Sequence, residues 1–426
     1  MGECYINRLP IELLAAILEE HSVLELRAPF IDSQVCSRWH ATTRLWPRVW
    51  SYITMRSKTE HRIPFNQFRA ILERSAATPL HVDLEYPDDG VGISSMMLFQ
   101  RATITRIQTL LLKGRLPGDI RVMKGMPNLR ILQLMECYWG GAIKFLLGAE
   151  TFPRLDELVV HSMGLLPPVA VGSPVPLRTI SFYDINHTEW VNILLECRET
   201  LVEVFLCRCQ LPLPPPTRIH LPNLKFLALS NMINFQNSTL NFRNNMLNFR
   251  NAIVAPGLIT FHEYFKRLAP LKVPFALSSI TEYACRAASP FVGSEPLLAE
   301  GVFPNLERFV LWGTWLRIRQ VLWELVSHPH TLPKLKTIEL ATENGRELSG
   351  TRWAELEKLV VHTPLSSVLK RPTDPRASYA CLRLAQVRGW LLIAQYSYTT
   401  VRHVGVSPKP EQYDVHFSNY INRMNE

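Results

Sequence analysis

The sequence predicts an α/β protein in which a small N-terminal helical unit precedes an irregular, curved solenoid with a largely parallel sheet and outer helices. Two observations predict it. Apolar residues between positions 9 and 50 recur at helical spacing, which is typical of amphipathic helices. A Leu-x-x-Leu-x-Leu pattern then recurs along the chain. One strand with one returning segment cannot bury its apolar side alone, so such units must stack.

The N-terminal unit is expected to begin with a helix just after Pro10, because a helix start does not need the N–H that Pro lacks. Apolar residues follow at helical spacing in three groups: Leu13, Leu14, Ile17 and Leu18; Val35, Cys36 and Trp39; Trp46 and Trp50. A unit of this size buries little area on its own. We therefore expect it to leave an apolar face that a partner helix can cover.

The ordered set Leu9-Pro10-Ile11-Glu12-Leu13-Leu14, Val35-Cys36-Ser37-Arg38-Trp39 and Trp46-Pro47-Arg48-Val49-Trp50 resembles an F-box. The resemblance implies three helices that bind a Skp-type adaptor and, through it, a cullin. The adaptor-binding residues that it implies are Leu9, Pro10, Glu12, Leu13, Ile17, Val35, Cys36, Trp39 and Trp50. Val49 departs from the usual Leu, and residues 27–30 lack the usual Asp-Leu. The alternative is that these are core positions of an ordinary helical subdomain.

Eight copies of the Leu-x-x-Leu-x-Leu pattern follow. They begin at Ile107, Leu129, Leu155, Leu177, Leu201, Leu224, Leu306 and Leu335, with degenerate copies at Leu258 and Ile280. The early steps are 22, 26, 22, 24 and 23 residues, within the range of leucine-rich repeats. Pro precedes several copies, as in Pro127-Asn128 and Pro222-Asn223, and would end the preceding helix. A non-solenoid α/β domain is the alternative, because Leu is common.

Together the two patterns resemble the F-box/leucine-rich-repeat proteins, particularly the degenerate version abundant in mushroom-forming fungi. In that family Asn or Cys after each strand satisfies backbone groups at the turn, and Cys137 and Cys209 occupy this position. The resemblance implies a non-catalytic, substrate-recognition subunit of a Skp-cullin-F-box ubiquitin ligase, with an unidentified protein substrate. A non-degradative leucine-rich-repeat scaffold or interaction module is the alternative.

Four regions are expected along the chain: the F-box at 1–54, a connecting helix and capping segment at 55–106, the solenoid at 107–345, and a C-terminal repeat and cap at 346–426. In the capping segment we expect a helix over Phe65–Ser75 and a strand near residues 78–84. Helices between repeats are expected at Glu189–Arg198, Arg317–Val326 and Arg352–His362, from their apolar spacing.

An insertion near residues 232–252 lengthens the step from Leu224 to Leu258 to 34 residues. It contains two near-duplicates, Thr239-Leu240-Asn241-Phe242-Arg243-Asn244 and Met246-Leu247-Asn248-Phe249-Arg250-Asn251. We interpret it as a surface extension, which solenoid loops tolerate, with a partner-contacting loop as the alternative.

Substrate binding is expected on the strand face that points away from the core. When the first, fourth and sixth repeat positions point inward, the fifth and seventh point outward. Among these residues we select Tyr183, Phe205 and Trp312, since interface energy concentrates in large aromatic side chains and Arg. A C-terminal segment that folds back would cover them.

Other function classes find little support in the sequence. It has no Gly-rich phosphate loop, His-Glu-x-x-His or Gly-x-Ser-x-Gly motif, so no catalytic residue, metal or cofactor is expected. The eight cysteines lack zinc-type spacing and are expected to be reduced thiols. The net charge is +9, but the Lys and Arg residues are scattered along the chain, so nucleic acid is not an expected partner. No run of eighteen apolar residues or secretion signal is found, which predicts a cytoplasmic or nuclear protein without membrane contact.

Overall fold

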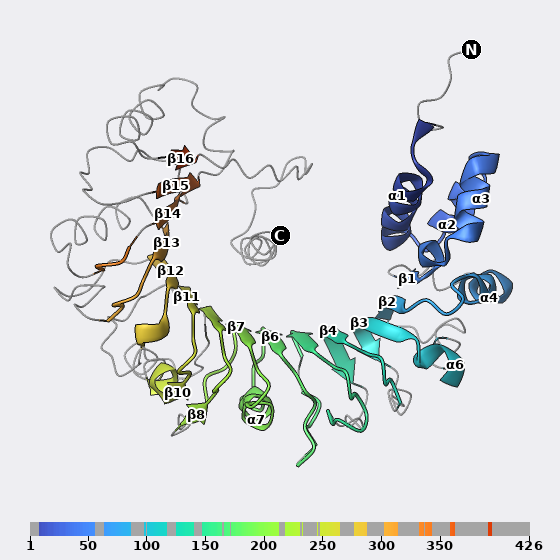
Figure 1. Cartoon of the computed structure of the whole chain (residues 1–426). Coiled ribbons are helices and arrows are strands. Elements are labelled where there is room, and N and C mark those ends of the chain that lie inside the picture. The colour runs from blue at the N-terminus through green and yellow to red at the C-terminus, as the bar shows by residue number, and fades with distance from the viewer. Residues whose placement is uncertain are drawn as a thin grey trace, which may run out of the picture.

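The computed structural model describes most of the chain up to residue 313 and short segments beyond it. These residues are 8–55, 64–86, 98, 100–116, 125–139, 147–163, 166–170, 172–212, 218–230, 232, 245, 248–264, 277–287, 302–313, 332–335, 337–342, 358–362 and 391–393. Together they form an α/β fold with a helical unit at one end of a long, open, curved sheet (Figure 1).

The helical unit consists of α1 (Ile11–Leu24), α2 (Ala28–Asp32), α3 (Ser37–Leu45) and the short 3-10 helix η2 (Pro47–Trp50). Pro10 occupies the N-cap of α1, and its carbonyl accepts a hydrogen bond from the N–H of Leu14. The helix therefore begins where the sequence predicts. The chain leaves η2 directly into the first strand of the sheet, which joins the helical unit to the solenoid.

All fourteen strands of the large sheet pair in parallel, in the order β1-β2-β3-β4-β5-β6-β7-β9-β11-β12-β13-β14-β15-β16. Their bounds are Tyr52–Met55, Leu80–Tyr86, Ile107–Leu116, Ile131–Trp139, Glu157–His161, Thr179–Tyr183, Glu203–Cys207, Phe226–Ser230, Thr260–Tyr264, Glu282–Ala287, Arg308–Gly313, Thr337–Thr342, Lys358–His362 and Leu391–Ile393. A separate small sheet joins β8 (Ile219–His220) and β10 (Ile253–Val254). Strands line the concave side of the arc (Figure 1).

The repeat pattern fixes which residues face the core. Leu132, Leu158, Ile180, Val204 and Leu227 occupy the fourth position of successive repeats, pair with one another in register, and are all completely buried. Because strand side chains alternate between the faces, this register holds the third, fifth and seventh positions on the concave face. The core thus runs as a continuous apolar row under the sheet.

Four consecutive strands each have a residue in a left-handed conformation, within β4 and directly after β5, β6 and β7. These residues are Glu136, Ser162, Asp184 and Arg208, with φ between 49° and 55°. The N–H of Asp184 donates to the carbonyl of Cys207 on the next strand at 2.9 Å. The N–H groups of Ser162 and Arg208 donate to the next strand in the same way. The positive φ, uncommon for residues with a side chain, is therefore fixed by a hydrogen bond between adjacent repeats.

The following residue explains the two cysteines at this turn. The thiol of Cys137 donates to the carbonyl of Leu112 at 3.1 Å, and that of Cys209 donates to the carbonyl of Phe182 at 3.4 Å. Both acceptors lie at the sixth position of the preceding repeat. The prediction that these thiols satisfy backbone groups is confirmed.

Asparagines before the repeats make a second set of bonds between neighbours. The side-chain amides of Asn128 and Asn223 each donate to a carbonyl of the preceding repeat, that of Thr105 or Glu199, at 2.7 Å. Only the Pro at these sites was interpreted from the sequence. The Asn beside it adds a bond that the repeated Pro-Asn dipeptide could have indicated.

Helices outside the sheet partly follow the prediction. α4 (Phe65–Arg74) and α7 (Trp190–Glu196) lie where helices were expected, and the described residues also form α6 (Arg101–Ile104) and the 3-10 helix η5 (Leu277–Ser279). α6 and α7 lie on the convex side (Figure 1). The expected helix Arg317–Val326 lies outside the described residues. The helix expected over Arg352–His362 is wrong at Lys358–His362, which forms β15, because its run of Leu-Val-Val suits a buried strand.

The insertion is not a simple surface extension. Phe249 is completely buried and Arg250 is only 4 % exposed, and the ring of Phe249 meets that of Trp190 edge to face at a centroid distance of 5.5 Å. The interpretation as a surface loop is therefore wrong for these residues. The insertion contributes side chains to the core beside α7, where an apolar ring fills space against the indole.

Candidate docking surfaces

The first candidate surface is the outer stripe of α1. Leu13, Ile17 and Leu24 are 54 %, 46 % and 71 % exposed, and their i, i+4, i+11 spacing places them on one side of the helix. On an adjacent side, roughly 100° around the helix, Leu14 and Leu18 are completely buried. The helix is thus apolar on two faces, and only one of them is used by the unit's own core.

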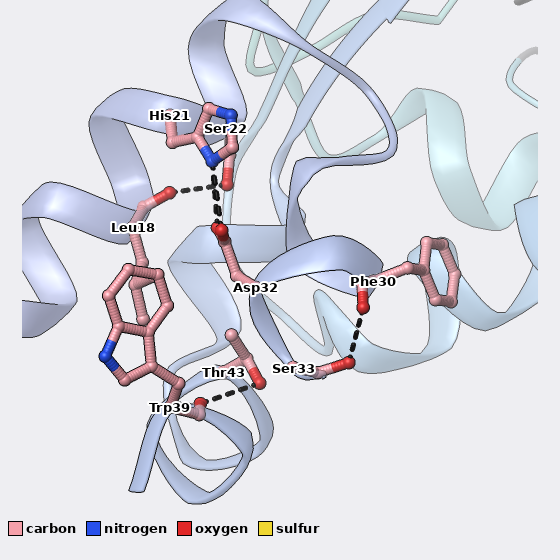
Figure 2. A network of polar contacts seen from close by, with 8 residues as sticks. All are labelled: Leu18, His21, Ser22, Phe30, Asp32, Ser33, Trp39 and Thr43. Carbon is pink, nitrogen blue, oxygen red and sulfur yellow. Dashed lines mark hydrogen bonds and ion pairs between the residues drawn. The ribbon is translucent and has the colours of Figure 1, made fainter. Parts of the chain in front are cut away.

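A polar contact fixes α1 against α2 (Figure 2). Nδ1 of His21 lies 3.0 Å from Oδ1 of Asp32 on α2, whose side chain is almost fully buried. Burial raises the pKa of the Asp32 carboxyl, and the His21 partner opposes this effect. The pair holds the end of α1 on α2, so the exposed stripe has a defined orientation on the unit.

The start of α1 is tied to α3. The guanidinium of Arg38 donates to the carbonyl of Leu9, and Leu9 itself is half-buried. Pro10 and Glu12 are exposed. All three predicted residues therefore lie at the surface end of the helix, next to Leu13.

The second predicted group lies at the start of α3. Val35 is 57 % exposed, while Cys36, the N-cap of α3, is half-buried. Trp39 is also half-buried and packs against the apolar core. Its indole N–H is buried without a hydrogen-bond partner among the described residues. Val35 therefore offers exposed apolar area, and Trp39 has a donor to satisfy.

Trp50 does not belong to the exposed set. It is 1 % exposed, its indole N–H donates to the carbonyl of Thr43 at 2.6 Å, and its ring meets that of Phe30 edge to face at 5.0 Å. The guanidinium of Arg74 on α4 covers the ring at 4.5 Å. The expectation that Trp50 contacts a partner is wrong in this structure. It joins the helical unit to the solenoid instead.

The second candidate surface is the concave face of the sheet. Of the residues predicted there, Tyr183 and Phe205 are half-buried and therefore partly accessible. Trp312 lies in β13, but its side chain is outside the described part. Ala228 and Val310, which were expected to point outward, are each only 7 % exposed, and Val310 packs with the buried Ala284 of the neighbouring strand.

A continuous row of side-chain contacts crosses this face over five strands. The rings of Phe205 and Phe226 lie 4.6 Å apart, and Phe226 meets the ring of His262 at 4.9 Å. Nε2 of His262 lies 3.1 Å from Oε1 of Glu282, and Nη1 of Arg308 lies 3.0 Å from Oε2 of that carboxylate. An apolar half of the row thus passes into a charged half.

The charged half affects the Glu282 carboxyl. Burial would raise its pKa, but hydrogen bonds and charge from His262 and Arg308 exceed that effect and hold the pKa below its ordinary value. This carboxylate is therefore ionised and already neutralised by the chain's own side chains.

Third-position residues such as Phe226, Glu282 and Arg308 were missed by the sequence analysis. The two-residue period that places the fifth and seventh positions outward does the same for the third. Every copy of the repeat therefore has a third outward position, and only the fifth and seventh were predicted from the sequence.

No metal or membrane site emerges from the described residues. Within them, no group of three or more His, Cys, Asp or Glu side chains is arranged to hold a metal ion. The longest described helix, α1, has 14 residues, and none of the described helices combines the length and apolarity that a bilayer span needs.

Comparison with known proteins adds no relative: no protein-family model matches the chain, and no curated protein matches it.

Proposed function

We propose that the protein is a non-catalytic substrate receptor of a Skp-cullin-F-box ubiquitin ligase. Its N-terminal helices would bind the adaptor, and its solenoid would hold a target protein. Tethering then raises the effective concentration of the target near the ubiquitin-carrying enzyme of the same assembly.

The observation that carries the proposal is the exposed apolar stripe of Leu13, Ile17 and Leu24. A helix that buries one face and exposes another apolar face is suited to a second helical protein. The F-box-like sequence order supports a Skp-type adaptor as that protein. The open sheet supports the second half of the proposal, because a curved solenoid provides an extended concave surface for a partner.

The test is complex formation between the purified full-length protein and a Skp-type adaptor. Ile17→Asp is expected to reduce adaptor binding at least about tenfold, since it places a charge in the centre of an apolar contact. Leu9→Ala with Pro10→Ala is expected to abolish adaptor capture while the solenoid stays folded. Adaptor binding that survives both changes would reject the proposal.

A matched control is available on the solenoid. Ile259 is 43 % exposed, close to the 46 % of Ile17, and Ile259→Asp makes the same chemical change far from α1. It should leave adaptor binding unchanged. Equal losses in both variants would indicate a general effect on folding and would count against the assignment.

A non-degradative scaffold is the second candidate, since the same exposed stripe could hold another partner. Cullin co-purification separates the two. If the adaptor binds but the assembled complex contains no cullin, the scaffold is the correct function.

A further inference from the structure

The concave face carries two carboxylates beside its aromatic pair. Glu157 on β5 and Glu203 on β7 share a row with Phe226 on β9, because Glu157 pairs in register with Thr179, Thr179 with Glu203, and Glu203 with Phe226. All of these side chains are half-buried. The two carboxylates lie two strand spacings apart, about 10 Å at the backbone, with Phe226 directly beside one of them.

Three other carboxylates on or beside this face are neutralised by the chain itself. Oε1 of Glu85 lies 3.1 Å from Nζ of Lys113, and Asp184 and Glu282 are paired with Arg208 and Arg308. Glu157 and Glu203 make no ion pair or hydrogen bond through their side chains within the described part of the chain. The chain has a net charge of +9. Two carboxylates on one face that form no ion pair therefore contrast with its overall positive charge.

Their environment disfavours the charge that they carry. Burial and the nearby Asp156 and Glu203 carboxylates raise the pKa of Glu157. Burial also raises the pKa of Glu203, an effect that Arg178 partly opposes and Asp156 strengthens. A cation supplied from outside would relieve both carboxylates, since an opposite charge favours the ionised form.

Ser181 adds a neutral polar group to the same place. It lies on β6 between Val159 and Phe205 in the strand register and is 6 % exposed. Its hydroxyl makes no hydrogen bond within the described residues. Ser181 therefore places a hydroxyl group without a hydrogen-bond partner beside Phe205, within the described part of this face.

We propose that the concave patch of Glu157, Ser181, Glu203, Phe205 and Phe226, called here the acidic-aromatic patch, binds a basic segment of a partner protein. An Arg or Lys side chain of that segment lies across the two Phe rings and directs its charge to the carboxylates. This deepens the proposed receptor function, on which its biological meaning rests. The binding itself requires no adaptor.

Charge and ring chemistry together select this occupant. A cation over an aromatic face is attracted by the ring quadrupole, and its alkyl stem covers apolar area at the same time. An acidic peptide or a nucleic acid would bring negative charge to two carboxylates that form no ion pair within the described part of the chain. Basic side chains are therefore the partner chemistry that both halves of the patch favour.

The test measures fluorescence anisotropy of a labelled peptide of interspersed Arg, Gly and Ser with the full-length protein. The same peptide with citrulline at every Arg removes the charge and keeps the shape. A peptide with Glu for Arg and a short single-stranded DNA complete the set. We expect the Arg peptide to bind at least roughly fivefold more tightly than the citrulline peptide, and more tightly than the other two probes.

The decisive variant is the double substitution Glu157→Gln with Glu203→Gln, which should weaken binding of the Arg peptide roughly tenfold. The matched control is Glu73→Gln with Glu199→Gln, which changes the charge equally at carboxylates 61 % and 68 % exposed, and it should bind as the unmodified protein does. Phe226→Leu should weaken binding of the Arg peptide while leaving binding of the Glu peptide unchanged.

Folding and adaptor docking are read separately. Because both carboxylates have raised pKa values, the double Gln variant should unfold at an equal or higher temperature, so a loss of peptide binding is not a loss of fold. Adaptor capture should be unchanged in it, which separates this proposal from the proposed function. Equal binding of the Arg and citrulline peptides, preferred binding of DNA, or full binding by the double Gln variant each overturns the proposal.

Discussion

Arg250 and Glu263 form an ion pair inside the solenoid, with 3.3 Å between Nη1 and Oε1 and side chains only 4 % and 3 % exposed. Glu263 occupies the sixth position of the copy that begins at Leu258, where other copies have Leu, Val, Phe or Cys. The hydroxyl of Tyr283 donates to its other oxygen at 3.3 Å. Burial raises the pKa of the Glu263 carboxyl, and Arg250 opposes this effect. The insertion thus supplies the cation that makes a buried acid tolerable.

Arg250→Met should destabilise the protein by about 3–5 kcal/mol, because it leaves a buried carboxylate without its cation. The measurement is the free energy of unfolding by denaturant at neutral pH. A loss below about 1 kcal/mol would mean that the pair contributes little.

The double substitution Arg250→Met with Glu263→Leu is the control for this prediction. It restores an apolar sixth position and removes both charges, so it should recover most of the stability, since apolar replacements of buried pairs are often neutral or favourable. Failure to recover would assign the loss to packing of the insertion rather than to the charge.

Trp50→Ala should destabilise the helical unit by about 3–5 kcal/mol, the usual cost of truncating a buried aromatic ring. Trp50→Phe keeps a ring but loses the bond to Thr43, which should cost about 1 kcal/mol. Hydrogen exchange of the α1 amides reports the loss, because it measures the free energy of opening at each amide. Leu45 is 71 % exposed, so Leu45→Ala should change the opening free energy from hydrogen exchange by less than about 0.5 kcal/mol. Comparable effects at both sites would contradict the core position of Trp50.

The fold class could be read from the sequence because its signals are periodic. The first, fourth and sixth positions of each repeat, such as Leu177, Ile180 and Phe182, point inward at a fixed period of two. The start of α1 could be read from Pro10 for a similarly local reason. The strand at Lys358–His362 could not, because a short apolar run fits a helix or a strand until its neighbour is known.

The sites were only partly predictable. The exposure of Leu13 and Ile17 was predictable, because this helix has more apolar residues than a single buried face can hold. The pairing of Arg250 with Glu263 did not, because it joins residues whose approach depends on how the insertion enters the core. Likewise, Trp39 and Trp50 are both tryptophans in neighbouring motifs, and the sequence does not distinguish them. Trp50 is buried because its ring packs against Phe30 and Arg74, whereas Trp39 is half-buried.

Two glutamates on the concave face should give pH profiles of opposite sign. The pKa of Glu282 lies below its ordinary value of 4.5, and that of Glu157 lies above it. The ionised form of Glu282 is favoured in the folded state, so its contribution to stability is present above pH 4.5 and is lost as pH falls through the folded pKa. The contribution of Glu157 is present below pH 4.5 and is lost as pH rises through its folded pKa.

Thermal midpoints of the single Gln variants, measured against pH, test this pair. Glu282→Gln should be less stable than the unmodified protein near neutral pH, with a deficit that shrinks in acid. Glu157→Gln should be more stable near neutral pH, with a gain that disappears in acid. Parallel difference curves for the two variants would contradict the assigned directions.

The described cysteines should divide into two reactivity classes under native alkylation with iodoacetamide at pH 8. Burial raises the pKa of the Cys137 and Cys197 thiols to about 12, and burial raises the pKa of Cys209 and Cys285 further. Since the thiolate is the nucleophile, these four should react at least ~100-fold more slowly than the half-buried Cys36 and Cys207. Mass spectrometry of digested protein gives the rate at each site. In denaturant all six should react alike, so slow labelling that persists there would point to covalent blocking rather than burial, and native labelling of Cys209 as fast as that of Cys36 would mean that its turn opens readily.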